Sequence, residues 1–485
     1  MILFQIKPMN YELLFWMVLY LVFILAISIR HLRPSDLDQY LVNNRQTKTL
    51  PLVFTTLATF VGGGTSIGLI AMGYESGLAA VGIGIAYVIG FVLLFFFAGH
   101  IRDFGAKHQL YSFPHYLNHL YTHFEKSRFT RIFSATVSGV NIFIFFFLLS
   151  AQFVAMASLL RYGFEIGYTT AVVISALIVV LYTAIAGLSG VIITDMVQFV
   201  AIVIMIVLVF IPGIIHDTEV FTRLSQLPAN MLNGTYYGWI FLIALPVFLS
   251  WSVLVRMDIW QRILAAKDRQ TARRVSLWSG LGMLPFYIVF PLVGMTIRVI
   301  SQEALSPKDV AYVFIDRHSN GMLYGFAMVG LLSALMSSGD SFLNIISISA
   351  IKDLVGWKLK NPKASRLSQG LLLRLATILF GVIALAMALV FPYIVDLMVI
   401  GISTITIFAP ITLFALINKE KVYSYRKAAL WSILSGFVLN TVLFVWGILI
   451  PEQFEPKNSF VPAFVVATLV LIIGVKLTKT KMKAI

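Results

Sequence analysis

The stretch MSSGDSFLN, residues 336–344, decides the fold because it puts polar side chains in the middle of a long apolar segment. The residues before it, 321–335, and after it, 345–351, are apolar enough for lipid. Four of its polar residues recur at the spacing of one helical face: Ser337, Asp340, Ser341 and Asn344. A charge at the centre of a bilayer costs at least about 2.5–3.5 kcal/mol. This face therefore points into a bundle of helices in a polytopic membrane protein.

The composition of the whole chain agrees with a membrane protein. Of its 485 residues, 59% are hydrophobic and only 12% are charged, which is not the balance of a soluble protein. Many apolar runs reach the ~18–20 residues that a spanning helix needs. We interpret the first run as a retained helix and not as a signal peptide, because no soluble domain follows it. We expect thirteen spans, at about 10–29, 51–72, 79–99, 131–160, 169–187, 190–212, 237–261, 275–297, 321–351, 368–390, 394–417, 428–450 and 460–477.

Lysine and arginine are distributed unequally between the connections. When alternate connections are assigned to two sides, one side, which includes Arg45, Arg102 and Arg262, carries 27 of the 36 basic residues and the other carries 7. By the positive-inside rule, the side with more basic residues is cytoplasmic. We therefore expect a multi-pass protein of the cell membrane, plasma or inner, with its amino terminus outside and its carboxy terminus in the cytoplasm. The same distribution explains the net charge of +15 without a nucleic-acid partner.

Several classes of site are excluded by the residues that the chain lacks. There is no cysteine, which excludes disulfides and thiol-ligated metals. Nothing in the sequence predicts an enzyme, because it shows no nucleophile–base pair, metal set or phosphate loop. Five of the eight histidines cluster near one connection, which we interpret as a wet loop beside the membrane and not as a metal site: His100, His108, His115, His119 and His123. No linker divides residues 1–485, so we expect a single membrane domain.

A second polar position within a span is Asp195, in GLSGVIITDMVQ (187–198). It lies beside Thr194 and one turn before Gln198. A helix-capping role is an alternative, but Asp195 is five residues past Gly190, which is deep for a cap. We therefore expect a role in binding a cation or a proton.

Three consecutive glycines interrupt another span, in TFVGGGTSIG (59–68). Such a run is a poor helix, and non-helical backbone at membrane depth is tolerated only where it is buried in protein or lines a wet cavity. Broken helices of transporters offer carbonyls to ions and half-helix amino termini to substrates. Close packing of helices through the glycines is the alternative. A nucleotide-binding glycine loop is not supported, because no strand precedes the segment.

The remaining polar positions have two interpretations each. The serines of 336–344 either bond back to carbonyls one turn earlier or, with Asp340 among them, present the oxygen atoms that hard cations prefer. In SWSVLVRMDIWQR (250–262), Arg256 either holds a substrate carboxylate through its guanidinium fork or forms an ion pair with Asp258. For the serine face we favour a cation site.

Together these segments resemble the sodium:solute symporter family, which includes carriers of proline, pantothenate, sialic acid, choline and sugars. The similarity covers about residues 36–420. It depends on the combination of four motifs and not on any single one: DLDQYLVNNR (36–45), AGLSGVIITDMVQ (186–198), WQRILAAKDRQTARR (260–274) and LMSSGDSFLNIISISAIKDL (335–354).

The resemblance implies an all-α polytopic fold with a LeuT-type core of ten helices in two inverted five-helix repeats. One peripheral helix precedes this core and two follow it, which matches the thirteen spans. Broken helices are expected at the start of each repeat, although the second has no glycine in its middle. The implied division is 10–29 for the first peripheral helix, 51–212 and 237–417 for the repeats, and 428–477 for the last two helices.

The resemblance also implies three sets of site residues. The principal sodium ion would bind the hydroxyls of Ser337 and Ser338 and the carbonyls of Ala334, Val61 and Gly64. A second cation, or equally a proton, would bind Asp195, Asp340 and Ser341. The solute would lie near Gly63, Thr65, Ser66, Tyr87, Gln152, Trp251 and Arg256. Packing is the alternative role for the two aromatic residues, and a hydrogen bond between helices is the alternative for Gln152.

The function that follows is sodium-coupled symport of a small polar organic solute into the cytoplasm by alternating access. Sodium is then a co-transported ion and not a prosthetic group, and the other partners are the solute and the lipid bilayer. No obligatory protein partner is evident. A proton-coupled carrier, a solute-sensing membrane module, a channel and a membrane enzyme are the alternatives. The sequence does not identify the solute, although the few charges near the pocket favour a neutral or zwitterionic molecule, or a carboxylate if Arg256 reaches it.

Overall fold

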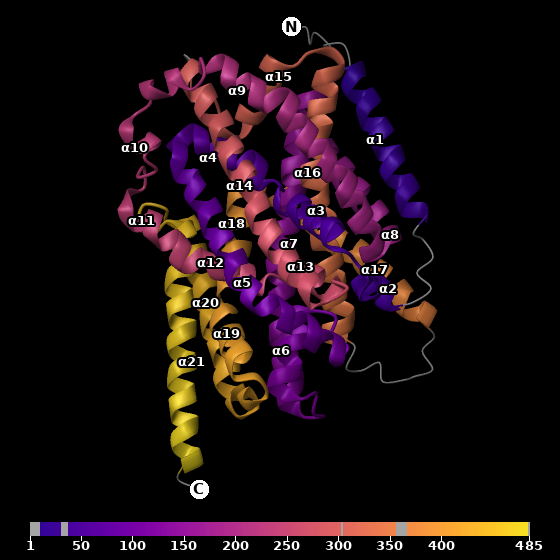
Figure 1. The fold of residues 1–485 in the computed structure, drawn as a ribbon, viewed down its shortest axis with the longest axis vertical. Helices are drawn as coiled ribbons and strands as arrows, with labels where there is room; N and C mark the ends of the chain where they lie inside the picture. The colour runs from indigo at the N-terminus through magenta and orange to yellow at the C-terminus, as the bar shows by residue number, and fades with distance from the viewer. Residues whose placement is uncertain (1–9, 31–36, 302–303, 356–365, 484–485) are drawn as a thin grey trace.

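The computed structural model describes residues 10–30, 37–301, 304–355 and 366–483, and these ranges are helical with no named strand (Figure 1). Most of the long helices run along the long axis of the molecule, and α1 lies at one edge of the bundle. The helices are α1 (Tyr11–Arg30), α2 (Leu37–Val42), α3 (Thr49–Phe60), α4 (Leu69–Ser76), α5 (Val81–Lys107), α6 (Phe113–Thr122), α7 (Arg128–Phe164), α8 (Tyr168–Met205), α9 (Ile211–Asp217), α10 (Ala229–Leu232), α11 (Gly238–Ala244), α12 (Ser250–Val255), α13 (Met257–Ala265), α14 (Arg269–Ile300), α15 (Val310–His318), α16 (Gly321–Ile348), α17 (Arg366–Val390), α18 (Ile394–Thr406), α19 (Ala409–Asn418), α20 (Arg426–Leu449) and α21 (Phe460–Lys483).

Twelve segments of the described chain are long and apolar enough to cross a membrane. The sequence predicts thirteen, and the difference arises at the predicted span 51–72. The structure divides this span into α3, with 12 residues, and α4, with 8 residues, so neither half is long enough to be counted alone. A turn at Gly77, whose φ is +63°, separates α4 from α5 and marks the boundary of the next predicted span.

The predicted spans 169–187 and 190–212 lie largely within one helical element, α8. A straight helix of its 38 residues would be about 57 Å long, which is more than one crossing needs. Tyr182 and Asp195 lie well apart along this element, yet both interact with Asp340 of α16. Two separate segments here are long and apolar enough to cross a membrane, Tyr168–Ile185 and Gly190–Asp217, as the sequence predicts.

Helix α16, which carries the segment 336–344, is the centre of the bundle. Every residue from Ala327 to Ala350 is buried. It packs against α1, α3, α7, α8 and α17. A helix that is apolar on most sides is expected to be covered on all of them, and its polar face is therefore enclosed by other helices, as predicted.

The prediction of a wet loop around the clustered histidines is wrong. Residues 113–122 form α6, whose apolar residues Phe113, Tyr116 and Leu120 are fully buried. These residues recur at helical spacing, so they form one face that packs against α7. Burial also lowers the pKa of His115 to about 4, so this imidazole is neutral near pH 7.

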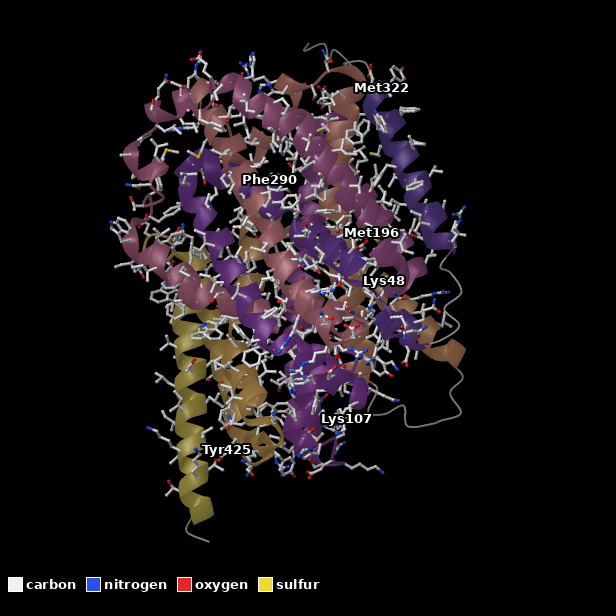
Figure 2. All side chains as sticks on the ribbon, in the orientation of Figure 1. Lys48, Lys107, Met196, Phe290, Met322 and Tyr425 are labelled. Atoms are coloured by element: carbon white, nitrogen blue, oxygen red, sulfur yellow. The ribbon has the colours of Figure 1, made fainter. Side chains whose placement is uncertain are left out.

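The two ends of the bundle differ in charge. One end, which we call the basic end, carries Arg45, Lys48, Arg102 and Lys107. Figure 2 shows Lys107 in the lower half of the molecule, Lys48 near mid-height and Met322 at the top. The carboxy terminus also lies at the bottom of the view (Figure 1), so α21 ends on the same side as the basic end.

Candidate cation and solute site

The glycine run in 59–68 breaks the second span, as the sequence predicts. Helix α3 ends at Phe60, and a short π-helical turn, Gly64–Gly68, precedes α4. A Cβ atom on Gly62 would lie 2.2 Å from Oγ of Ser338, and one on Gly64 would lie 2.2 Å from Cε of Met398. The missing side chains therefore let α16 and α18 approach the broken backbone directly.

Three hydrogen bonds join this first break to its surroundings. The Ser338 hydroxyl donates to the Thr59 carbonyl at 2.7 Å, which links α16 to α3. The Gly63 amide donates to Oε1 of Gln152 on α7 at 2.8 Å. The Ser66 hydroxyl donates to the Gly62 carbonyl at 2.9 Å. Polar groups that the break frees are thus satisfied inside the protein, as they must be at membrane depth.

The second break lies at Arg256, between α12 and α13, where the backbone is extended (φ −72°, ψ 123°). The Arg256 guanidinium donates to both carboxylate oxygens of Asp258, at 3.0 Å from Nε and 2.6 Å from Nη2. It also lies over the ring of Phe60, 4.1 Å from the centroid. The fork of Arg256 is therefore engaged by an ion pair, and the two breaks touch through Phe60.

A buried arginine lies between α3, α8 and α16. Nη2 of Arg262, on α13, donates to Oγ of Ser341 at 2.8 Å and to Oγ1 of Thr59 at 2.9 Å, and it lies 3.4 Å from Oδ2 of Asp195. Thr55 also donates to the Asp195 carboxylate. Arg262 is only 1% exposed and Asp195 is fully buried.

The assignment of Arg262 to a cytoplasmic connection is wrong. Helix α13 continues to Ala265, past the predicted end of the span at residue 261, and turns Arg262 into the bundle. Removing it from the count leaves the unequal distribution of basic residues in place.

The polar face of α16 retains oxygen atoms without partners. Asp340 accepts a hydrogen bond from the Tyr182 hydroxyl at 2.8 Å through Oδ2. In the described part of the chain, Oδ1 of Asp340, Oδ1 of Asp195 and Oγ of Ser337 are buried and have no hydrogen-bond partner. Ser337 lies beside Asp195, and the two carboxylates interact electrostatically. We call Asp195, Asp340, Ser337, Ser341 and Arg262 the carboxylate cluster.

The charges of the carboxylate cluster do not balance. It holds two carboxylates and one guanidinium among the described residues, and all three are at least 99% buried. An uncompensated charge in a buried site is strongly unfavourable. The cluster therefore fits one further positive charge, either a cation at its unpartnered oxygens or a proton on a carboxylate.

The two segments that carry the predicted principal sodium ligands meet at Ser338. Ser338 contacts Thr59 and Gly62, which lie on either side of the predicted ligand Val61. The Ser338 hydroxyl also lies 3.4 Å from the carbonyl of Ala334, another predicted ligand. The remaining two predicted ligands are Gly64, at the start of the π turn, and Ser337, one position before Ser338.

Most of the predicted solute residues also gather at the breaks. Thr65 lies 3.3 Å from the hydroxyl of Tyr287, and the ring of Tyr87 packs against Phe60 and Tyr287. Trp251 lies on α12 and is only partly buried. Gly63, Ser66 and Gln152 meet at the first break, and Phe60 connects Tyr87 with Arg256 at the second.

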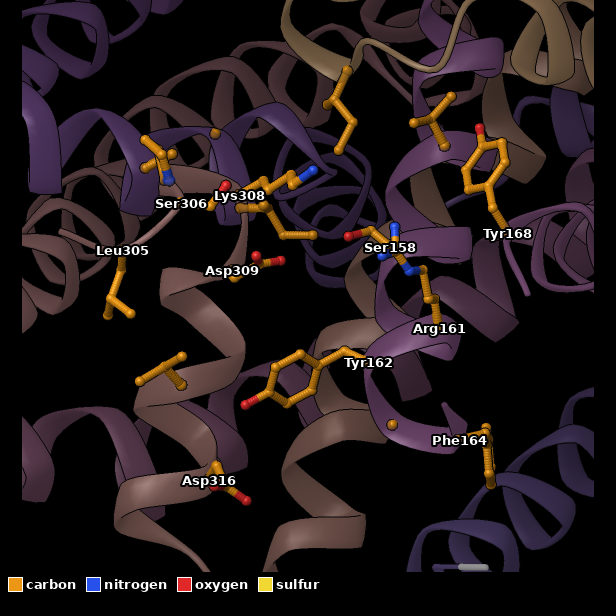
Figure 3. A pocket seen from close by; sticks show the side chains of 18 of the residues that line it. Ser158, Arg161, Tyr162, Phe164, Tyr168, Leu305, Ser306, Lys308, Asp309 and Asp316 are labelled. Carbon is orange, nitrogen blue, oxygen red and sulfur yellow. The ribbon is translucent and has the colours of Figure 1, made fainter. Parts of the chain in front are cut away.

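A cavity of about 1370 Å³ approaches the first break from the end opposite the basic end. Ile67, Gly68 and Ala71 line it on the side of the break. Figure 3 shows Arg161 and Asp316 among its walls, which come mainly from α7, the segment 305–309 and α18.

The basic end is tied together by arginines. Arg45 donates to the carbonyls of Leu110, at 2.7 Å, and Leu264, at 3.1 Å. Nε of Arg102 donates to the carbonyl of Ala266 at 3.0 Å. The end of α13 is thereby held to the segments around it.

Sequence reasoning missed several residues of these sites: Tyr20, Thr55, Thr59, Tyr182, Arg262 and Tyr287. Thr55 and Thr59 carried a readable signal, because they lie four positions apart on one face of an otherwise apolar helix. Tyr20, whose hydroxyl accepts a hydrogen bond from Gln198, gave none, because an aromatic residue in α1 looks like any lipid-facing side chain.

Comparisons with known proteins agree with this geometry. A family model described as the sodium:solute symporter family matches residues 40–436. A sodium/proline symporter of Staphylococcus aureus is 23% identical in an alignment 500 residues long, which covers 97% of this chain and 93% of the relative.

Two solved structures share the fold. A substrate-bound, outward-open Na⁺-coupled sialic acid symporter superposes with a TM-score of 0.76 at 18% identity, covering 97% of each chain. Mhp1, a nucleobase-cation-symport-1 family transporter in a closed conformation, has a TM-score of 0.59 at 15% identity, covering 93% of this chain and 96% of that one. These likenesses confirm the predicted all-α, LeuT-type fold, whereas the boundaries of the two repeats stay a prediction. The chain belongs to the sodium:solute symporter family, and it is a multi-pass membrane protein that carries out sodium-coupled symport.

Proposed function

We propose that this symporter carries a small polar organic solute into the cytoplasm together with sodium, by alternating access. One observation carries the proposal: the serine face of α16 meets the glycine break of α3 and α4 at the Ser338–Thr59 contact. Oxygen atoms from two distant segments thus meet at one buried position. Oxygen is the type of ligand that a hard cation needs.

The principal sodium ion binds the hydroxyls of Ser337 and Ser338 and the carbonyls of Ala334, Val61 and Gly64. The unpaired hydroxyl of Ser337 supports this set, because a buried polar atom without a partner is unfavourable unless a ligand satisfies it. The unbalanced charge of the carboxylate cluster supports a second cation or a proton there. Asp195, Asp340 and Ser341 are its ligands from the chain.

The solute binds where the two breaks meet, near Gly63, Thr65, Ser66, Tyr87, Gln152, Trp251 and Arg256. Because Asp258 already engages the Arg256 fork, an anionic solute would have to displace a buried carboxylate. A neutral or zwitterionic solute can instead use both members of the ion pair. Proline, the solute that the name of one relative gives, is a zwitterion of this class.

The cavity and the arginine ties suggest which side is open. If the basic end is cytoplasmic, as the positive-inside rule predicts, the cavity opens outside and the ties at Arg45 and Arg102 close the inside. The amino terminus is then outside and the carboxy terminus inside. In the transport cycle, the hydrogen bonds of Arg45 and Arg102 at the end of α13 break while the cavity closes. Sodium and solute then leave to the cytoplasm.

The driving force is sufficient for uptake against a gradient. One positive charge that moves inward through about 100 mV releases ~2.3 kcal/mol, and a tenfold sodium gradient adds ~1.4 kcal/mol. Together they allow a solute to accumulate several-hundredfold per sodium ion. Sodium and solute must each raise the affinity for the other by the same factor.

A thermal-shift screen of the purified protein against a library of small polar solutes tests this function. A true substrate should raise the melting temperature more in sodium than in potassium, because the two ligands bind the same state together. Uptake of that solute into proteoliposomes should then follow an inward sodium gradient. A solute whose stabilisation and uptake follow a proton gradient, with no effect of sodium, would overturn sodium coupling in favour of proton coupling.

A further inference from the structure

Arg262 occupies part of the carboxylate cluster in which the second cation is proposed to bind. Its Nη2 atom reaches Ser341 and lies near Asp195, two of the three chain ligands assigned to that cation. The third ligand, Asp340, also interacts electrostatically with Arg262. A guanidinium is charged at every physiological pH.

We propose that Arg262 is a built-in cation of the carboxylate cluster and sets how many external cations the cluster binds. This inference rests on the proposed function. With Arg262 in place, two carboxylates need one external positive charge. Without it, the same carboxylates need two.

The atoms that remain free agree with this number. Arg262 engages Oδ2 of Asp195 and Oγ of Ser341, and the Tyr182 hydroxyl engages Oδ2 of Asp340. Since Ser337 is assigned to the principal sodium ion, what is left is one oxygen on each carboxylate. These two carboxylate oxygens suit one monovalent ion, and the positive guanidinium beside them repels a second.

The helix that carries Arg262 connects this charge to the closed end of the protein. Arg45 binds the carbonyl of Leu264 near the end of α13, and Arg102 binds the carbonyl of Ala266 just after it. A movement of α13 that breaks these ties also withdraws Arg262 from Asp195. The cluster then has a different charge in the two arrangements of α13, so that its cation affinity depends on whether the basic end is closed.

Equilibrium binding of radioactive sodium to the purified full-length protein in nanodiscs tests the inference without a solute. The measurement is repeated at increasing alkaline pH until the number no longer changes, because burial favours the neutral form of a carboxyl group and a bound proton would replace sodium. Arg262→Gln should bind one more sodium ion per chain than the wild type. Arg262→Lys, which keeps the charge, should bind the wild-type number. Arg426→Gln, which removes an arginine that pairs with Glu125 outside the cluster, is the matched control and should also bind the wild-type number.

A second pair of variants covers the case in which Arg262→Gln does not fold. Asp340→Asn leaves one carboxylate opposite Arg262, so it should bind one sodium ion fewer than the wild type. The double variant Arg262→Gln/Asp340→Asn restores the net charge of the wild-type cluster and should restore its number. An unchanged number in Asp340→Asn would overturn the inference, as would an unchanged number in Arg262→Gln where that variant folds.

The outcomes separate the two proposals. If the wild type binds no sodium, the proposed sodium coupling fails, whatever the variants do. If the wild type binds sodium and the number does not follow the charge of the cluster, only the role of Arg262 fails.

Discussion

The two breaks in the bundle are made in opposite ways. The first, between α3 and α4, depends on side chains that are absent: Gly62 and Gly64 leave room for Ser338 and Met398. The second, at Arg256, depends on a side chain that is present and paired with Asp258. A break made by glycine follows from local backbone preference, whereas the ion pair of the second break joins residues two positions apart and is enclosed by Phe60 from the first break.

The difference also separates what each break does. The glycine break exposes backbone to the serine face of α16 and so belongs to the sodium site. The Arg256 break puts a buried ion pair against Phe60 and Tyr87 and so belongs to the solute pocket. The contact between Arg256 and Phe60 joins the first break to the second. Coupling between ion and solute requires such a structural element that both sites share.

Breaking the ion pair of the second break should have the largest effect. Asp258→Asn leaves the buried charge of Arg256 without a partner, which costs about 3–5 kcal/mol of stability. Equilibrium denaturation in mixed micelles measures this loss. The double variant Arg256→Gln/Asp258→Asn removes both charges and should recover most of the stability. If the single variant is as stable as the wild type, the pair does not hold the second break.

Filling the first break should have a somewhat smaller effect. The Cβ atom of Gly62→Ala meets both Oγ and Cβ of Ser338 at under 3.0 Å, and overpacking of this kind costs about 1–3 kcal/mol. We expect a lower melting temperature and a loss of sodium-dependent stabilisation. Gly68→Ala is the matched control, since its Cβ would lie 3.5 Å from the Gly63 carbonyl, an ordinary contact. Equal behaviour of the two variants would remove the contact with α16 from the explanation.

Removing one oxygen from the first break should weaken sodium binding without unfolding the protein. Ser338→Ala deletes the hydroxyl that contacts Thr59, and the loss of one polar contact of about 1.4 kcal/mol lowers sodium affinity roughly tenfold. The sodium concentration that half-stabilises the purified protein measures this shift. Ser347→Ala, on the same helix but bonded to Leu343 and Thr377, should leave it unchanged. Unchanged sodium activation in Ser338→Ala would remove the site assignment.

The smallest effect is expected at the edge of the solute pocket. Tyr287→Phe removes the hydroxyl beside Thr65, and a single neutral hydrogen bond contributes about 0.5–1.5 kcal/mol. Solute affinity should fall several-fold while sodium binding alone is unchanged, which titrations of each ligand distinguish. The control is Tyr121→Phe, which loses the hydrogen bond from Tyr121 in α6 to the Ile411 carbonyl in α19. It should change neither the solute affinity nor the sodium affinity. A loss of sodium affinity in Tyr287→Phe would mean that the two sites are not separable as described.

Much of the fold was predictable from sequence because it depends on length and apolarity alone. The polar face of α16 and the glycine break follow from helical spacing and from glycine's poor helix propensity. The helix α6 was missed although its apolar spacing was readable, because five histidines suggested a wet loop. The break at Arg256 was expected from resemblance alone and has no local signal.

The site was predicted in its separate parts but not in its connections. Ser338, Asp195 and Asp340 stand out because each is polar within an apolar run. Arg262 does not, because at the end of a span it has the pattern of a cytoplasmic charge. Its burial depends on how far α13 continues, and helix ends are the least certain part of any sequence-based assignment.

The sequence by itself determined that this chain is a helical membrane protein with oxygen-bearing side chains enclosed in its bundle, because a bilayer accepts charge only on an inward face. Only the tertiary structure decided which charges meet. Thr55 and Asp195 are 140 positions apart, and Thr59 and Ser341 are 282 positions apart. Such neighbours are set by how helices pack against one another, and the spacing along one helix contains no information about the residues that the next helix presents.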